Sequence, residues 1–112
     1  MLLLDNITND PKQIMRLVVS GYETAEFYIE YKPNQYGWFF TLTWQDFTVT
    51  NQRITASPNF LRQYKKILPF GLLCSTNNNT DPLTQDSFLT NCKIYYLDSD
   101  DVDETELVIY GV

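Results

Sequence analysis

The most regular pattern of hydrophobic and polar positions lies in residues 25–44, where two alternating stretches are separated by a short turn. Before the turn, Phe27 and Ile29 stand at every second position between polar or charged residues, as in a strand with one buried face. After the turn, aromatic residues, leucine and threonine follow each other with the same period. Pro33 and Gly37 lie between the stretches and are typical turn residues. The segment therefore predicts a β-hairpin.

The period of two assigns the residues of this hairpin to two faces, because successive strand side chains point in opposite directions. We expect the inner face to carry most of the core, and it consists of Phe27, Ile29, Tyr31, Trp38, Phe40, Leu42 and Trp44. The outer face includes Tyr28, Glu30 and Phe39. Phe39 is unexpected there, since it is a large apolar ring on the polar side of the hairpin.

Shorter patterns flank the hairpin on both sides. Spacings of three and four residues predict one short helix over residues 60–67, with Leu61, Tyr64 and Ile67 facing inward. The polar residues 75–87 predict an exposed loop. Alternating or β-branched runs predict strands at residues 13–19, 47–50, 53–56, 70–75, 91–97 and 107–110, and residues 2–4 are expected to form a strand or a docking arm.

The order of these elements predicts an all-β fold, mainly antiparallel, built as a compact small β-barrel or sandwich. We expect a meander in the N-terminal half and one short helical turn around residues 60–67. At 112 residues the chain fits a single β-domain, residues 1–112, with enough length to bury a core. Within it we expect an N-terminal arm at residues 1–12, and an acidic turn with a C-terminal strand or arm at residues 98–112.

The charge and residue content exclude several functions. A net charge of −6 argues against binding nucleic acid through its phosphates, which requires a basic surface. The chain has no histidine, so the commonest general base and metal ligand is missing. Residues 98–104 contain five carboxylates, but they lack the glycine and the terminal glutamate of an EF-hand loop, which favours a solvated turn. We therefore expect no enzyme activity, no catalytic residue, no cofactor and no metal.

The two cysteines, Cys74 and Cys92, both lie in apolar runs. We expect two buried reduced thiols, and the alternative is a bridge between neighbouring strands. No apolar run approaches the ~18 residues that a membrane span needs. The first residues do not have the basic start and long apolar core of a signal peptide, so we expect folding in a cytoplasm-like compartment.

A series of segments between about Gln13 and Leu97 has a characteristic order and spacing. They are the opening strand Ile14 to Gly21, the hairpin Glu26 to Trp44, Leu61-Arg62-Gln63-Tyr64, Leu68-Pro69-Phe70-Gly71, Asp81-Pro82 and Asn91 to Leu97. In this order and spacing the chain resembles the small baseplate plug proteins of contractile-tailed phages, the family that includes the plug of a cyanophage baseplate. Residues 1–12 and the acidic tail depart from the resemblance.

This resemblance implies a structural protein of the virion tail baseplate, which plugs or lines the hub and tail-tube lumen above the spike. It further implies assembly in the host cytoplasm, contacts with hub, spike and tail-tube initiator proteins, and several copies, with three around the tail axis as our expectation. On this interpretation a partner covers the outer face of the hairpin and the apolar arms. The expected interface residues are Leu2, Leu3, Leu4, Tyr28, Phe39, Leu107, Ile109 and Tyr110.

Two alternative functions belong to different classes. The first is a small-molecule-binding β-barrel with Tyr31, Tyr36, Trp38 and Trp44 around its mouth, although these residues fit core and rim positions of the hairpin better. The second is a phage-encoded protein that binds a host factor and is absent from purified virions.

Overall fold

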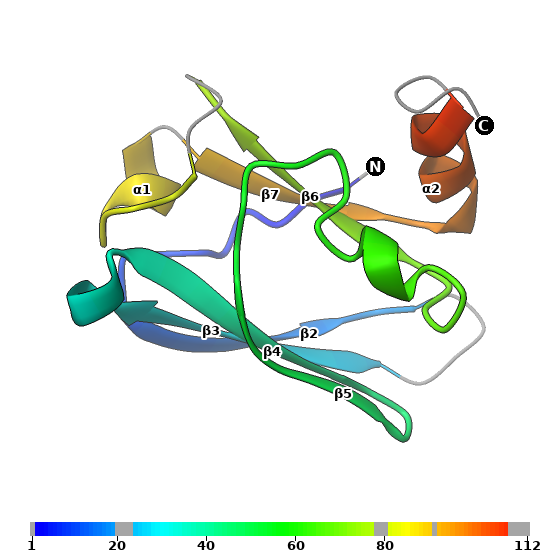
Figure 1. Ribbon diagram of the computed structural model, residues 1–112, viewed down its shortest axis with the longest axis horizontal. Coiled ribbons are helices and arrows are strands. Elements are labelled where there is room, and N and C mark those ends of the chain that lie inside the picture. The colour runs from blue at the N-terminus through cyan, green and yellow to red at the C-terminus, as the bar shows by residue number, and fades with distance from the viewer. Residues whose placement is uncertain (1, 20–23, 78–80, 91, 108–112) are drawn as a thin grey trace.

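The computed structural model describes residues 2–19, 24–77, 81–90 and 92–107 and arranges their strands in two antiparallel sheets that face each other (Figure 1). This arrangement confirms the all-β fold and selects the sandwich form of it. The four-stranded sheet consists of β2 (Lys12–Leu17), β3 (Ala25–Lys32), β4 (Gly37–Trp44) and β5 (Phe47–Arg53), in that order. The three-stranded sheet has the order β1 (Leu2–Leu3), β7 (Cys92–Leu97) and β6 (Gly71–Thr76).

The predicted hairpin is confirmed as β3 and β4, the central strands of the larger sheet. Its register places Phe27 opposite Leu42 and Ile29 opposite Phe40, so the inner face is apolar across both strands. β2 adds the third strand of the predicted meander and buries Met15 on the same face. The hairpin is therefore the framework on which one half of the sandwich is built.

The hairpin turn consists of a short 3₁₀ helix, η1 (Pro33–Gln35), followed by Tyr36 in the left-handed conformation with φ of 49°. The next residue is Gly37. A Cβ at this position would collide with the guanidinium of Arg53, which packs directly over the backbone. A larger residue at this position would require the guanidinium, which is the end of a flexible side chain, to move away.

β5 is one strand where the sequence predicted two with a break at residues 51–52. Asn51 has φ of 57°, and the register between β4 and β5 shifts between Phe40 and Leu42, as in a β-bulge. The polar pair that suggested a break therefore marks an irregularity within the strand. Beyond it, Ile54 is fully buried and its N–H donates to the carbonyl of Trp38 at 2.8 Å.

The outer edge of β6 is covered by the segment around Asn59. Ser57 and Cys74 exchange two backbone hydrogen bonds of 3.1 and 3.0 Å. The buried amide of Asn59 then takes the place of a further strand, because its Oδ1 accepts from the N–H of Leu72 at 3.1 Å and from that of Leu61 at 3.0 Å. One polar side chain thus satisfies two buried backbone donors.

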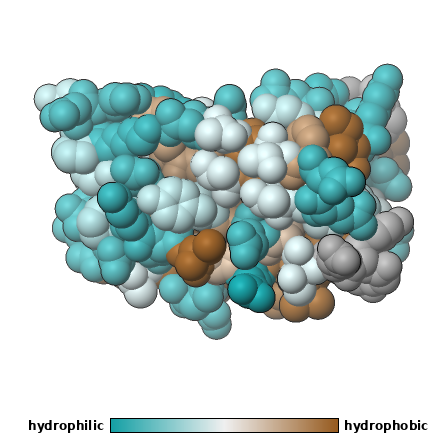
Figure 2. Space-filling view, turned by 90° about the horizontal axis from the view of Figure 1, so that it is seen from below, coloured by the Kyte–Doolittle hydropathy of each residue, from teal (hydrophilic) through white to brown (hydrophobic). Residues whose placement is uncertain are grey.

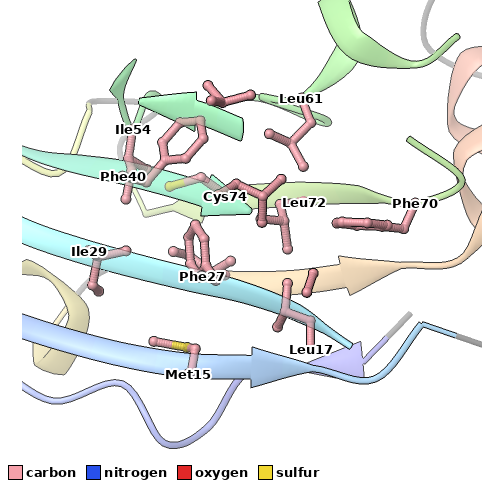
Figure 3. Packing of buried hydrophobic residues seen from close by; sticks show 14 of the residues in the cluster. Met15, Leu17, Phe27, Ile29, Phe40, Ile54, Leu61, Phe70, Leu72 and Cys74 are labelled. Carbon is pink, nitrogen blue, oxygen red and sulfur yellow. The ribbon is translucent and has the colours of Figure 1, made fainter. Parts of the chain in front are cut away.

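The hydrophobic core lies between the two sheets, and Figure 3 shows side chains from both pointing into this layer. Phe27 is fully buried at its centre, with its ring centroid 5.9 Å from that of Phe40 and 6.4 Å from that of Phe60. Burial of a side chain of this size stabilises the fold by about 1.5–3 kcal/mol. Other fully buried members are Ile29, Trp38, Leu42, Ile54, Leu61, Leu72, Ile94 and Leu97.

The helix predicted over residues 60–67 is reduced to one 3₁₀ turn, η2 (Arg62–Tyr64). Leu61 is buried and Tyr64 packs against the core, as predicted, but Ile67 is 51% exposed. Leu68 is buried in its place. A 3₁₀ turn has three residues per turn and rarely continues, so the helical spacing that placed Ile67 inward ends before that residue.

Two short helices were not predicted. α1 (Ser87–Thr90) ends the polar loop, and α2 (Ser99–Thr105) replaces the predicted acidic turn. Leu107 continues the helical path after α2, so the strand predicted at residues 107–110 is wrong at its first residue. The rest of that strand lies outside the described residues.

Candidate interaction surfaces

The N-terminal residues form a strand that docks on their own chain. In β1, Leu2 pairs with Tyr96 and Leu3 with Tyr95. Leu4 packs against the core, and its N–H donates to the carbonyl of Ile94 at 2.9 Å. Leu2 remains 63% exposed at the edge of the sheet. The predicted arm is therefore an edge strand with an apolar residue open to a neighbour.

A pocket of about 190 Å³ lies between this strand and α1. Its wall is mainly apolar, with one carboxylate and one amine. The lining residues are Leu3, Leu4, Asp5, Ile7, Phe88, Cys92, Lys93 and Ile94. This volume is below the roughly 300–1,000 Å³ of typical ligand sites, so the pocket suits an apolar side chain better than a cofactor.

Cys74 and Cys92 are both buried and are not joined by a disulfide, as predicted. Burial raises the pKa of the Cys74 thiol to about 12, with smaller contributions from Cys92 and Asp81. Burial also raises the pKa of Cys92, against the opposing effect of a hydrogen bond with Ser87. Both groups are therefore protonated at neutral pH and are poor nucleophiles.

The outer sheet face is the solvent side of the four-stranded sheet, and Figure 2 shows that side of the molecule as largely hydrophilic with separate apolar patches. Its members alternate with the core residues along the strands. They include Lys12, Ile14, Arg16, Glu26, Tyr28, Glu30, Lys32, Phe39, Thr41, Thr43, Thr48 and Arg53.

Phe39 lies on this outer sheet face, as predicted, but its own chain covers it. The ring is 8% exposed, with Lys32 Nζ at 4.9 Å and Arg53 Cζ at 4.8 Å from its centroid. Lys32 Nζ also contacts Asn51 Oδ1. We expected a partner to cover this ring, but two cation–π contacts within the chain shield it from solvent instead.

Arg53 is held over Phe39 by the hairpin turn. Its two terminal nitrogens donate to the carbonyls of Gln35 at 2.8 Å and Tyr36 at 3.2 Å. These contacts fix the guanidinium above the backbone of Gly37. Arg53 thus closes the turn and shields the ring with one side chain.

Tyr28 is half-buried on the same face, where its hydroxyl donates to Glu30 Oε1 at 3.2 Å. Partial burial, and then the negative charge of Glu30, raise the pKa of Tyr28. The hydroxyl is therefore neutral at physiological pH and available only as a hydrogen-bonding group.

The acidic segment at residues 98–107 is a capped helix. The Asp98 side chain accepts from the N–H of Asp101 at 2.8 Å, and the Asp101 carboxylate accepts from the N–H of Asp98 at 3.3 Å. This reciprocal pair is a capping box. An Asp followed three residues later by another acid was the signal in the sequence that could have predicted α2.

Glu106 fastens this helix to the body of the protein. Its side chain is 8% exposed, and its two oxygens lie 2.9 and 3.2 Å from Arg62 Nε. Lys65 Nζ is 3.6 Å from the second oxygen. Arg62, together with Lys65, therefore holds a buried carboxylate that lies 44 residues from Arg62 in the chain.

The eight predicted interface residues do not form one surface among the described residues. Leu2 and Leu3 are exposed on β1, Leu4 is half-buried beside them, and Tyr28 and Phe39 lie on the other sheet. Leu107 is exposed after α2. Ile109 and Tyr110 lie outside the described residues. The open apolar positions are therefore split between the two ends of the chain.

The aromatic residues of the small-molecule alternative do not surround a mouth. Trp38 is fully buried, with its Nε1 donating to the carbonyl of Thr84 at 2.9 Å. Trp44 is also buried, whereas Tyr36 is 72% exposed. In the described ranges there is no cluster of three or more His, Cys, Asp or Glu side chains that could hold a metal ion. No helix in those ranges is long and apolar enough to cross a membrane.

Comparison with known protein families matches residues 1–100 to the family described as cyanophage baseplate Pam3 plug gp18. The chain belongs to this baseplate plug family. The match includes β1, so the leader that departed from the resemblance in the sequence is part of the family pattern. A comparison with curated proteins found no match. Most of α2 and the residues after it lie beyond the matched range.

Membership of the plug family indicates a structural role in a phage baseplate. It points to a non-enzymatic protein of the virion tail that associates with other baseplate proteins. Surfaces open to such association in the described residues include the apolar edge at β1, the outer sheet face and the acidic α2.

Proposed function

We propose that this protein closes the central lumen of a contractile phage tail at the baseplate hub, above the spike. The observation that carries the proposal is the family match over residues 1–100, since the family is described as a baseplate plug. The proposal includes contacts with hub, spike and tail-tube initiator proteins and assembly in the host cytoplasm.

The form of the molecule supports this role. Both sheets bury their inner faces in one continuous core, which suits a rigid body that blocks a channel. Edge strands β1 and β2 carry exposed apolar residues, Leu2 and Ile14, which suit contacts with neighbouring subunits. We further propose three copies around the tail axis.

Mass spectrometry of purified tails tests the location and the copy number. We expect this chain in the particles, at a ratio to the hub protein that corresponds to three copies per tail. Tails assembled without the chain should show an open lumen by electron microscopy. If purified tails lack the chain and it stays in the soluble lysate, the proposal is wrong and the host-factor alternative is favoured.

A further inference from the structure

The charges of this protein are distributed unevenly between two surfaces. Strands β2 to β5 place four of the eight basic residues of the chain on the outer sheet face, together with two of its 14 acidic residues. The basic residues are Lys12, Arg16, Lys32 and Arg53, and the acidic ones are Glu26 and Glu30. The outer sheet face thus carries an excess of positive charge on a strongly acidic protein.

Two of these cations are available to a partner at the edge of the sheet. Lys32 and Arg53 make cation–π contacts with Phe39. Lys12 and Arg16, in contrast, are exposed on edge strand β2. Among the described residues, the ion pair of Arg16 is a long one of 3.8 Å to Glu26, and both side chains are at least half exposed. Ile14, which is 64% exposed, lies between the two cations. We call Lys12, Ile14 and Arg16 the β2 patch.

The complementary pattern occurs on α2. Asp100, Asp103 and Glu104 are exposed, and Leu107 adds an exposed apolar side chain directly after the helix. We call these four residues the α2 patch. The capping box and the Glu106 anchor fix the helix on the body, so the α2 patch is presented in one orientation. The α2 patch places carboxylates beside the apolar Leu107, and the β2 patch places cations on both sides of the apolar Ile14, so the two patches are complementary in charge.

A single copy cannot join its own two patches. α2 packs at the end of the three-stranded sheet, while the outer sheet face points away from it on the far side of the sandwich (Figure 1). A contact between them must therefore join two copies. The surfaces are different, so the contact is heterologous and can close into a ring.

We propose that the β2 patch of one copy receives the α2 patch of the next. This inference rests on the proposed multi-copy plug, for which it supplies the subunit contact. Opposite charges would orient the approach, and Ile14 and Leu107 would exclude water between the charged groups. The contact uses a helix that lies mostly outside the family match, so it would be a feature of this chain in particular.

Paired charge reversals test the inference by sedimentation velocity at low ionic strength. We expect the unmodified protein to associate with rising concentration and to dissociate with added salt. A β2 variant, Lys12→Glu with Arg16→Glu, and an α2 variant, Asp103→Lys with Glu104→Lys, should each associate more than about tenfold more weakly, since like charges then face each other. A 1:1 mixture of the two should associate again, because the unchanged α2 patch of the first variant meets the unchanged β2 patch of the second, and the two reversed patches also carry opposite charges.

Matched controls reverse charges elsewhere on the surface. Lys93→Glu on β7 and Asp46→Lys at the β4 to β5 turn change the net charge but neither patch, and they should associate like the unmodified protein. Circular dichroism and thermal unfolding verify that each variant is folded. If a reversal fails to fold, the neutral versions with Gln or Asn replace it, with a smaller loss expected.

Three results would overturn the inference: an unmodified protein that stays monomeric, a mixture that stays monomeric, or controls that lose association equally. Each leaves the proposed function standing if the chain is still found in purified tails. Conversely, absence from tails would remove the plug role even if the two patches pair in solution.

Discussion

The β3 to β4 hairpin and the C-terminal segment at residues 98–107 are held in the protein by different physical means. The hairpin places fully buried side chains such as Phe27 and Ile29 in the common core, and their free energy comes from removal of apolar surface from water. The C-terminal segment buries one apolar side chain of α2, Val102, and depends on a capping box and on Glu106.

This difference has consequences for how each region opens. Apolar burial is shared among many core residues, so loss of the hairpin removes the whole sandwich. The C-terminal segment is attached through few contacts, one of them between charged groups, and such a unit can open locally while the rest stays folded. Four substitutions test this comparison, from the largest expected effect to the smallest.

Phe27→Ala should unfold the protein globally. The ring is fully buried and contacts both Phe40 and Phe60, so its removal leaves a cavity and costs about 3–5 kcal/mol in the free energy of unfolding. Urea unfolding measures the loss. Ile14→Ala on the outer sheet face is the control and, at a concentration where the protein is monomeric, should change stability by less than about 0.5 kcal/mol. Equal effects of the two variants would contradict the assigned faces.

Asn59→Ala should cost about 2–3 kcal/mol, because the N–H groups of Leu61 and Leu72 lose their acceptor in a buried place. The effect should be global, since this amide covers the edge of β6. Gln63→Ala, on the exposed side of the same segment, is the matched control and should leave urea unfolding unchanged. If Asn59→Ala lowers the free energy of unfolding no more than the control does, water accepts the hydrogen bonds of the two N–H groups in place of the amide.

Glu106→Gln should loosen α2 and leave the sandwich intact. The neutral amide keeps the shape but loses the charge that Arg62 and Lys65 contact, at a cost of about 1–2 kcal/mol because both cations are partly exposed. Hydrogen exchange should accelerate across residues 99–107. Labelling of Cys74 at pH 8 should stay as slow as before, since the thiol is buried and its pKa is raised to about 12.

Glu104→Gln is the matched control for that variant, because Glu104 is exposed on the same helix. Because Glu104 belongs to the α2 patch, the comparison is made at a concentration where the protein is monomeric, and there its hydrogen exchange should equal that of the unmodified protein. Faster labelling of Cys74 in Glu106→Gln would mean that α2 and the core open together, and the two regions would then not be independent.

Asp98→Ala should give the smallest effect, a loss of about 1 kcal/mol that is again confined to α2. The substitution removes the oxygen that accepts from the N–H of Asp101. Asp98→Asn keeps a good N-cap acceptor and should restore most of the slow exchange. If Asp98→Ala exchanges like the unmodified protein, the cap does not limit opening, and Glu106 and the buried Val102 hold the helix.

Much of the fold could be predicted because its signals are local. The alternation at residues 25–44 predicted the hairpin and both its faces, and the runs at 13–19, 70–75 and 91–97 predicted β2, β6 and β7. The buried state of both cysteines followed from their apolar surroundings. The helix α2 has a local signal too, the pair Asp98 and Asp101 of its capping box. It was not predicted because the run of five carboxylates was interpreted as a solvated turn.

The candidate surfaces were less predictable, since their exposure depends on side chains that are distant in sequence. Phe39 was expected to need a partner, yet Lys32 and Arg53 cover it from two other strands. Ile67 was expected inside, but a 3₁₀ turn moved it to the surface. The β2 patch and the α2 patch became visible only when the strands were placed in their sheets.

The sequence by itself determined that this protein is built from antiparallel strands around an aromatic hairpin, because a period of two along the chain decides which side chains are buried together. The tertiary structure alone decided how the strands divide into two sheets, how Asn59 covers β6, and how Arg62 meets Glu106 44 residues later. These features depend on long-range packing and on hydrogen bonds between distant segments, and no local pattern of residues encodes such partners.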